Sequence, residues 1–187
     1  MHWRIFVLVA LVGTLPVFSG CGSGLLSSWG ELGEEVSAGP YRIQIPKRFK
    51  RATNTPQLPG ETKIIFRGPS FGNDGPGILV SFGRHHQDFS QRGPNWNEGI
   101  RRGLSGLRAK SQDFSYDVGS PTTLNGLPAV RVQFKGKLQE KGKSHAMEGI
   151  GYLLIDNEYL AFVIGMNFGR GAESSLAKLE KSIQTIK

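Results

Sequence analysis

The sequence contains a single cysteine among 187 residues, which excludes an intramolecular disulfide. It also lacks the run of about 20 apolar residues that a transmembrane helix requires. Acidic residues are relatively few, because 15 Asp and Glu stand against 23 Lys and Arg and leave a net charge of +8. This excess favours anionic partners such as phospholipid headgroups, acidic polymers or acidic proteins, without choosing among them.

Signatures of catalysis are also missing. The glycine-rich stretch from Gly68 to Gly75 is a run of turn residues, and it is not followed by the Gly-Lys-Ser or Gly-Lys-Thr of a phosphate-binding loop. The acidic residues that could pair for acid-base chemistry are placed in or beside expected turns, where solvation explains them. We therefore expect no catalytic residues and no cofactor, and consider an enzyme less favoured than a binding module.

The first twenty residues have the layout of a lipoprotein signal peptide. A short start carrying one basic residue, Arg4, precedes the apolar run from Ile5 to Leu15 and the sequence Phe18-Ser19-Gly20-Cys21. The Ser-Gly-Cys ending resembles the bacterial lipobox, which implies that Cys21 carries the lipid and that the protein is exported and anchored to a bacterial membrane, facing the periplasm or the cell exterior. The alternative is an ordinary secretory peptide followed by an incidental cysteine.

Residues 21–39 are predicted to be a flexible, lipid-anchored tether, because they are rich in Gly and Ser and cannot bury much surface. Residues 40–187 then form one domain, since this length supports a single core and no comfortable second one.

Several strands are predicted within this domain. Tyr41, Ile43 and Ile45 alternate with polar residues and predict a half-buried strand that ends at Pro46. Two pairs of segments predict hairpins: Lys63–Arg67 with Ile78–Phe82, and Thr122–Leu124 with Ala129–Lys135, the second pair joined by an Asn125-Gly126 turn. The segments 150–155 and 159–166 are apolar at almost every position, so they are expected to be buried on both faces.

Two segments have helical periodicity. Residues 95–110 place Trp96, Ile100, Leu104 and Leu107 on one stripe, with arginines on the opposite side, and residues 172–186 repeat the pattern. Because strands buried on both faces need cover on both, we predict an α+β fold: an antiparallel sheet covered by helices on both faces.

The order of these elements resembles the PsbP-like α/β/α sandwich group. The residues that carry the resemblance are Tyr41–Pro46 with Phe49, the segment Leu124-Asn-Gly-Leu-Pro-Ala129, a long apolar hairpin and a closing helix. The group includes an extrinsic subunit of photosystem II, a nuclear import factor and many bacterial lipoproteins. The resemblance implies a fold and transfers no ligand residues, because a fold alone does not define a function.

One loop combines aromatic, basic and imidazole side chains. This loop runs from Phe82 to Arg92, and with Phe71 from the preceding turn it predicts a partner-binding surface formed by Phe71, Arg84, His85, His86, Phe89 and Arg92. The leading hypothesis is a noncatalytic, lipid-anchored binding or scaffold module of the cell envelope that contacts the membrane through Cys21 and takes an envelope protein or an anionic polymer as partner. Nucleic acid is not expected in that compartment. The alternative is a metal-binding protein or enzyme that uses His85 and His86, with His145 completing the site.

Overall fold

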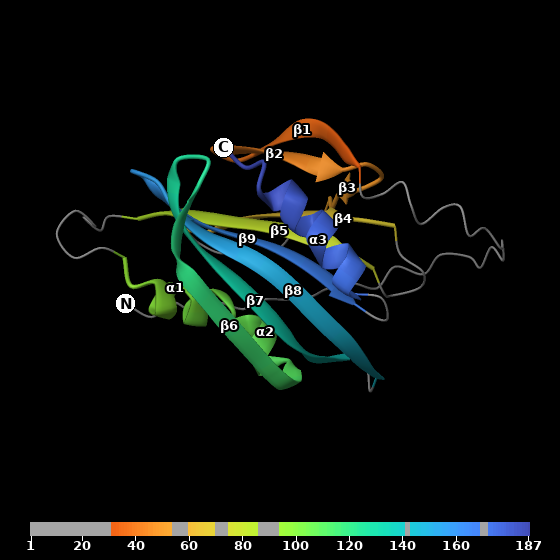
Figure 1. Cartoon of the computed structure of the whole chain (residues 1–187). Helices are drawn as coiled ribbons and strands as arrows, with labels where there is room; N and C mark the ends of the chain where they lie inside the picture. Colours follow the sequence, from red (N-terminus) through yellow and green to blue (C-terminus); the bar gives the residue numbers. More distant parts are fainter. Residues whose placement is uncertain (1–30, 54–59, 70–74, 86–93, 141–142, 169–171) are drawn as a thin grey trace.

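The computed structural model describes residues 31–53, 60–69, 75–85, 94–140, 143–168 and 172–187 (Figure 1). Its strands are β1 (Leu32–Ala38), β2 (Tyr41–Pro46), β3 (Lys50–Arg51), β4 (Thr62–Arg67), β5 (Gly77–Arg84), β6 (Ser111–Leu124), β7 (Leu127–Glu140), β8 (Lys143–Ile155) and β9 (Tyr159–Phe168). Its helices are α1 (Trp96–Gly103), α2 (Ser105–Ala109) and α3 (Ala172–Ile183).

The strands form two antiparallel sheets. The larger sheet has seven strands in the order β3-β4-β5-β9-β8-β7-β6, and β1 pairs with β2 in a separate sheet of two. On the central strands alternate residues point to opposite faces, so Tyr152 and Val163 belong to one hydrophobic core while Leu153 and Phe162 belong to the other. The large sheet therefore separates two cores.

The first core lies between the large sheet and a layer made of α3 and the β1–β2 sheet. The whole apolar stripe of α3 and the residues that follow it is buried in this core: Leu176, Leu179, Ile183 and Ile186. Ile43 and Ile45 of β2 enter the same core. The backbone of Arg42 also exchanges two hydrogen bonds with that of Lys187, which ties β2 to the segment after α3.

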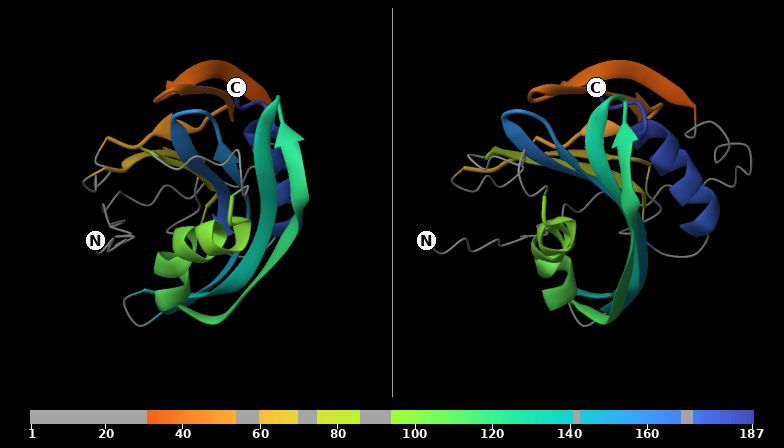
Figure 2. Two further views of the ribbon diagram at one scale, coloured as in Figure 1. Left: turned by 90° about the vertical axis from the view of Figure 1, so that its left-hand side faces the viewer. Right: turned by 60° about the vertical axis from the view of Figure 1, so that its left-hand side comes forward.

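The second core lies between the opposite face of the sheet and the helices α1 and α2. Ile100, Leu104 and Leu107 are buried against this face. Gly103 allows the close approach, because a Cβ atom at this position would lie 2.4 Å from the Cδ1 of Phe162. Figure 2 shows α1 and α2 on one side of the sheet and α3 on the other.

The prediction of an antiparallel sheet covered by helices on both faces is wrong. The described chain is mostly strand, and helices do not cover either face alone: α1 and α2 have only eight and five residues, and α3 shares its face with the β1–β2 sheet (Figures 1 and 2). The physical reason lies in residues 32–38. Their Gly- and Ser-rich surroundings indicated a tether, but they form β1, whose Ala38 is buried in the first core.

Most predicted strands are confirmed, although several elements are longer or shorter than expected. The strand ending at Pro46, both hairpins and the two buried central strands are present. Asn125 and Gly126 have φ angles of 49° and 85°, as a type I′ turn requires. However, β6 begins at Ser111, and the helical segment from residue 95 is divided at Leu104 into α1 and α2.

The long strand β6 forms one edge of the large sheet. Its pairing with β7 is interrupted twice, between Gln112 and Ser115 and between Val118 and Pro121. Proline has no backbone N–H to offer a further strand, and interruptions of this kind bend an edge. The register shifts and the proline therefore leave only short segments of β6 with the regular backbone that a further strand would need for pairing.

Candidate functional site

The structure describes part of the predicted partner-binding surface. Arg84 is the last residue of β5, and His85 follows it directly. The other predicted residues of this surface, and the predicted lipidation site, lie outside the described residues: Phe71, His86, Phe89, Arg92 and Cys21.

The turn between β8 and β9 is organised by Asp156. One carboxylate oxygen accepts hydrogen bonds from the backbone N–H groups of Glu158 and Tyr159, at 2.7 and 2.6 Å. The other accepts the Tyr41 hydroxyl at 2.8 Å. Burial, and then the bond to Asp156, raise the pKa of Tyr41 above its ordinary value. The carboxylate therefore fixes the turn and ties it to β2.

His85 contacts the same turn from the end of β5. Its backbone N–H donates to the carbonyl of Glu158 at 2.9 Å, and its ring Nε2 lies 2.9 Å from the carbonyl oxygen of Asp156. Because a carbonyl oxygen only accepts, Nε2 must carry the proton of this bond. In this arrangement His85 connects β5 to the turn, and its Nε2 is not available as a metal ligand.

Arg84 is presented outward beside an aromatic ring. Its guanidinium carbon lies 5.8 Å from the centroid of the Tyr159 ring, its Nε donates to the Tyr159 hydroxyl at 3.4 Å, and its side chain remains 70% exposed. A cation held over an aromatic face retains its charge for a partner while its side chain is positioned.

His145 lies far from this end of the molecule. It pairs with Leu138 near the start of β8, whereas His85 contacts the turn that follows the end of β8. The ten residue steps from His145 to Ile155 span roughly 33 Å in an extended strand. The structure therefore does not bring His85 and His145 together, and in the described ranges no three His, Cys, Asp or Glu side chains are placed to hold a metal ion.

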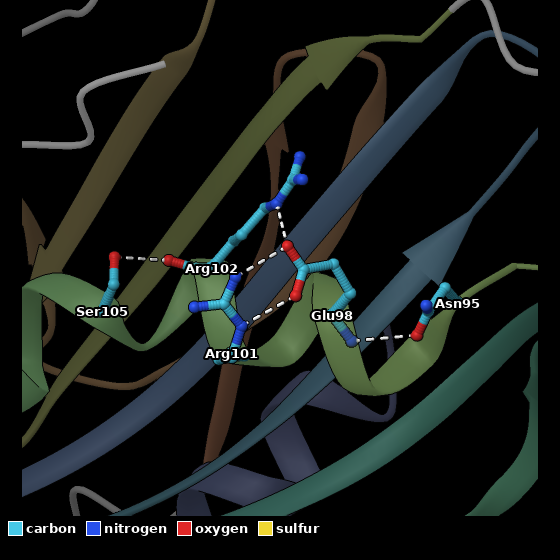
Figure 3. A network of polar contacts seen from close by, with 5 residues as sticks. All are labelled: Asn95, Glu98, Arg101, Arg102 and Ser105. Atoms are coloured by element: carbon cyan, nitrogen blue, oxygen red, sulfur yellow. Dashed lines mark hydrogen bonds and ion pairs between the residues drawn. The ribbon is translucent and has the colours of Figure 1, made fainter. Parts of the chain in front are cut away.

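A second polar cluster lies on α1, on the opposite face of the sheet (Figure 3). The Asn95 side chain caps the helix by accepting from the backbone N–H of Glu98 at 3.1 Å. Arg101 then binds the Glu98 carboxylate through Nε and one terminal nitrogen, at 2.7 and 2.8 Å, while Arg102 binds it through Nε at 2.5 Å. Hydrogen bonds from Arg101 and Arg102 lower the pKa of Glu98 to about 2.

The arginines of α1 and α2 are all exposed on the helix pair. At about 100° per residue, Arg102 lies roughly opposite the buried Ile100, whereas Arg101 projects about 100° from it, and Arg108 is exposed on α2. We call Arg101, Arg102 and Arg108, together with Tyr116 of the neighbouring strand β6, the arginine face. Sequence reasoning placed these arginines on the polar side of a helix but did not treat them as a site. The spacing of Glu98 three and four residues before two arginines was the available signal.

Comparisons with known proteins show the fold. No protein-family model matches the chain, and no curated protein matches its sequence. The solution structure of cyanobacterial PsbP (CyanoP) from Synechocystis sp. PCC 6803 is similar with a TM-score of 0.55 and 11% identity, over 90% of this chain and 97% of that one. The crystal structure of LpqN, involved in cell envelope biogenesis of Mycobacterium tuberculosis, aligns with a TM-score of 0.48 and 16% identity, over 79% of this chain and 83% of that one.

The similarity to the cyanobacterial protein confirms the PsbP-like resemblance at the level of the fold. At 11% identity it carries no function to this chain. Of the helices in the described ranges, none has the length and apolar character needed to cross a membrane.

Proposed function

We propose that this protein is a noncatalytic binding or scaffold module of the bacterial cell envelope, held to a membrane by lipid on Cys21. The arrangement around Asp156 is the observation that favours a binding role over catalysis. Its carboxylate is used by two backbone N–H groups and the Tyr41 hydroxyl, and His85 is used to hold the same turn. The groups that could perform acid-base chemistry at this end therefore stabilise a rigid surface.

The proposed partner surface is the end of the sheet that carries Arg84 and His85. Arg84 offers an exposed cation on a positioned side chain, paired only loosely with the exposed Glu158 at 4.0 Å, and this suits an envelope protein or an anionic polymer. Phe71, His86, Phe89 and Arg92 are proposed to extend the surface. The sequence before Cys21 supports placing this surface in the periplasm or at the cell exterior.

The lipid anchor is tested by the Cys21→Ser variant expressed in a bacterial host with radiolabelled palmitate. The variant should take up no label and should keep its first twenty residues, because acylation of the thiol precedes cleavage in the lipobox pathway. A Ser23→Ala variant is the matched control and should be labelled and cleaved normally. Label in the Cys21→Ser protein would show that the anchor is assigned to the wrong residue.

The binding role of the loop is tested against metal binding with His85→Ala/His86→Ala. The double variant should lose only about 1 kcal/mol of stability, from the bond between His85 and Asp156. Zinc in modest excess should leave the melting temperature of both proteins unchanged, since a ligand stabilises only a protein that binds it in the native state. A zinc-dependent rise in the unmodified protein that the double variant lacks would instead support a metal site.

A further inference from the structure

The arginine face combines exposed cations with an exposed aromatic residue. The side chains of Arg101 and Arg102 are 59% and 63% exposed, and Arg108 is exposed as well. Tyr116 is the one large apolar side chain of the described residues that is classed as exposed. The pKa of Arg101 is raised, mainly by its bond to Glu98 and to a smaller extent by the nearby Tyr116. Tyr116 lies opposite Phe134 of the second core in the β6–β7 pair, so its ring is on the side of the sheet that carries α1 and α2.

Within the chain, Glu98 already provides a carboxylate ligand for two arginines of this surface. Two guanidinium groups converge on one carboxylate, and Arg101 holds it with two parallel bonds, the geometry in which arginine recognises carboxylates. Arg102 contacts Glu98 through Nε, and its terminal nitrogens point away from the carboxylate (Figure 3). Arg101 and Arg102 contact this one carboxylate and Arg108 is exposed on α2, so the three arginines keep a net positive charge and donors for further carboxylates.

The position of the arginine face argues against lipid headgroups as its ligand, a step that rests on the proposed anchor. The chain from Cys21 joins the domain at β1, in the layer that covers the first core, whereas the arginine face lies on the other side of the sheet (Figure 2). The ten residue steps from Cys21 to Glu31 span at most about 35 Å. The proposed anchor is thus attached to the β1–β2 side, and the arginine face lies beyond the large sheet from the point of attachment.

We propose that the arginine face is a docking surface for an acidic segment of a partner protein. Carboxylates of the partner pair with Arg101, Arg102 and Arg108, and an apolar partner residue packs on Tyr116. Arginine and tyrosine are enriched among the residues that dominate the affinity of protein interfaces, which favours a protein over a simple polyanion.

Binding is measured by fluorescence anisotropy with the full chain, purified in a nonionic detergent, and a labelled oligoglutamate peptide that carries one central phenylalanine. Arg101→Gln/Arg102→Gln should weaken binding by about tenfold, and Glu98→Gln should strengthen it several-fold because both guanidinium groups are released. Tyr116→Ala should weaken the binding of the peptide that contains phenylalanine, but it should not change the binding of a pure oligoglutamate. Circular dichroism should show that these variants keep the fold, since they change exposed or half-buried side chains.

The matched control is Arg42→Gln/Lys47→Gln. It removes two exposed cations, each paired with a glutamate, from the β1–β2 side, and should leave peptide binding unchanged. Equal weakening in this control would show that net charge alone drives binding and would overturn the proposal. So would tighter binding of polyphosphate or of micelles containing phosphatidylglycerol. Failure of the lipid anchor would appear in the palmitate experiment and would not alter peptide binding in solution.

Discussion

The carboxylate of Glu98 is held by two arginines although the group lies at the surface. Its pKa of about 2 compares with an ordinary value of 4.5, so the carboxylate stays ionised over most of the acid range. A depressed pKa means that the ion pairs contribute to stability above about pH 4.5 and are lost as the pH falls toward 2. The alignment of the two guanidinium groups therefore persists at neutral and mildly acidic pH.

A carbon-13 NMR titration of the glutamate carboxyl groups should find Glu98 as the carboxyl with an apparent pKa near 2. In Arg102→Gln the apparent pKa should move toward 4.5, because one of its two hydrogen-bond donors is gone. Arg108→Gln, on the same face and without a contact to Glu98 among those described, serves as the control and should leave it unchanged. An unperturbed value in the original protein would contradict the paired arrangement.

Adjacent residues of β7 face opposite layers and should tolerate charge very differently. Val132 is fully buried in the second core, whereas Arg131 is half-exposed and pairs with Glu180 of α3 at 2.8 Å. Val132→Asp should lower the free energy of unfolding by about 4 kcal/mol, because it buries an unpaired carboxylate. Arg131→Asp should cost about 1–2 kcal/mol, since it replaces an ion pair with two like charges. Urea denaturation compares them, and equal losses would mean that the two residues do not face opposite layers.

At the scale of elements, the sequence predicted those strands whose side chains alternate or are continuously apolar. β2, β4, β5, β9 and the second half of β8 were predicted from these patterns. The turn at Asn125-Gly126 was predicted from its Asn-Gly sequence, because these residues readily adopt the positive φ angles that the structure shows. β1 and the first half of β6 could not be found in this way. Both are edge segments with polar, Gly- or Ser-containing sequences, and their pairing depends on a partner strand rather than on their own pattern.

The candidate sites were predictable to different degrees. The ion pairs of Glu98 follow from local spacing, because residues three and four apart are neighbours on a helix. Arg84 was predicted as part of a partner surface from the basic and aromatic residues around it in the sequence. The contact of His85 with Asp156 was not predictable, since it joins residues 71 positions apart. The separation of His85 from His145 likewise required the order of the strands in the sheet.

The helix α1 has a glycine, Gly103, where it packs on the sheet. Replacing this glycine has two opposing effects on stability: a gain in helix propensity and a loss from overpacking. Gly103→Ala adds helix propensity of up to about 1 kcal/mol but places a Cβ atom 2.4 Å from the ring of Phe162. Overpacking typically costs 1–3 kcal/mol, so we expect a net loss of about 1 kcal/mol in chemical denaturation. The exposed Asn97→Ala in the same helix gains propensity alone and should be slightly stabilising. A stabilised Gly103→Ala protein would show that α1 can move away from Phe162 without cost.

At the scale of the whole molecule, the large sheet divides the protein into a side from which the N-terminal segment leaves and a side that carries the arginine face. With lipid on Cys21, a fluorophore at Arg42→Cys should therefore lie closer to labelled headgroups than one at Ser105→Cys. The expected difference is roughly 20 Å, from a sheet layer and a helix layer of about 10 Å each. Energy transfer in proteoliposomes measures it. Similar transfer from both positions would show that the domain has no preferred orientation.

The interruptions in the edge strand β6 would matter most where many copies of the protein are anchored to one membrane. Lipidation as proposed would confine the domains to a thin layer, where local concentrations reach the millimolar range that favours even weak encounters. A long, regular strand edge in such a layer would template pairing between neighbours and lead toward fibrous aggregates. The register shifts around Gln112 and Val118, together with Pro121, leave little regular edge for a second copy to extend. Many copies could therefore be held close together on one membrane without pairing through their strand edges.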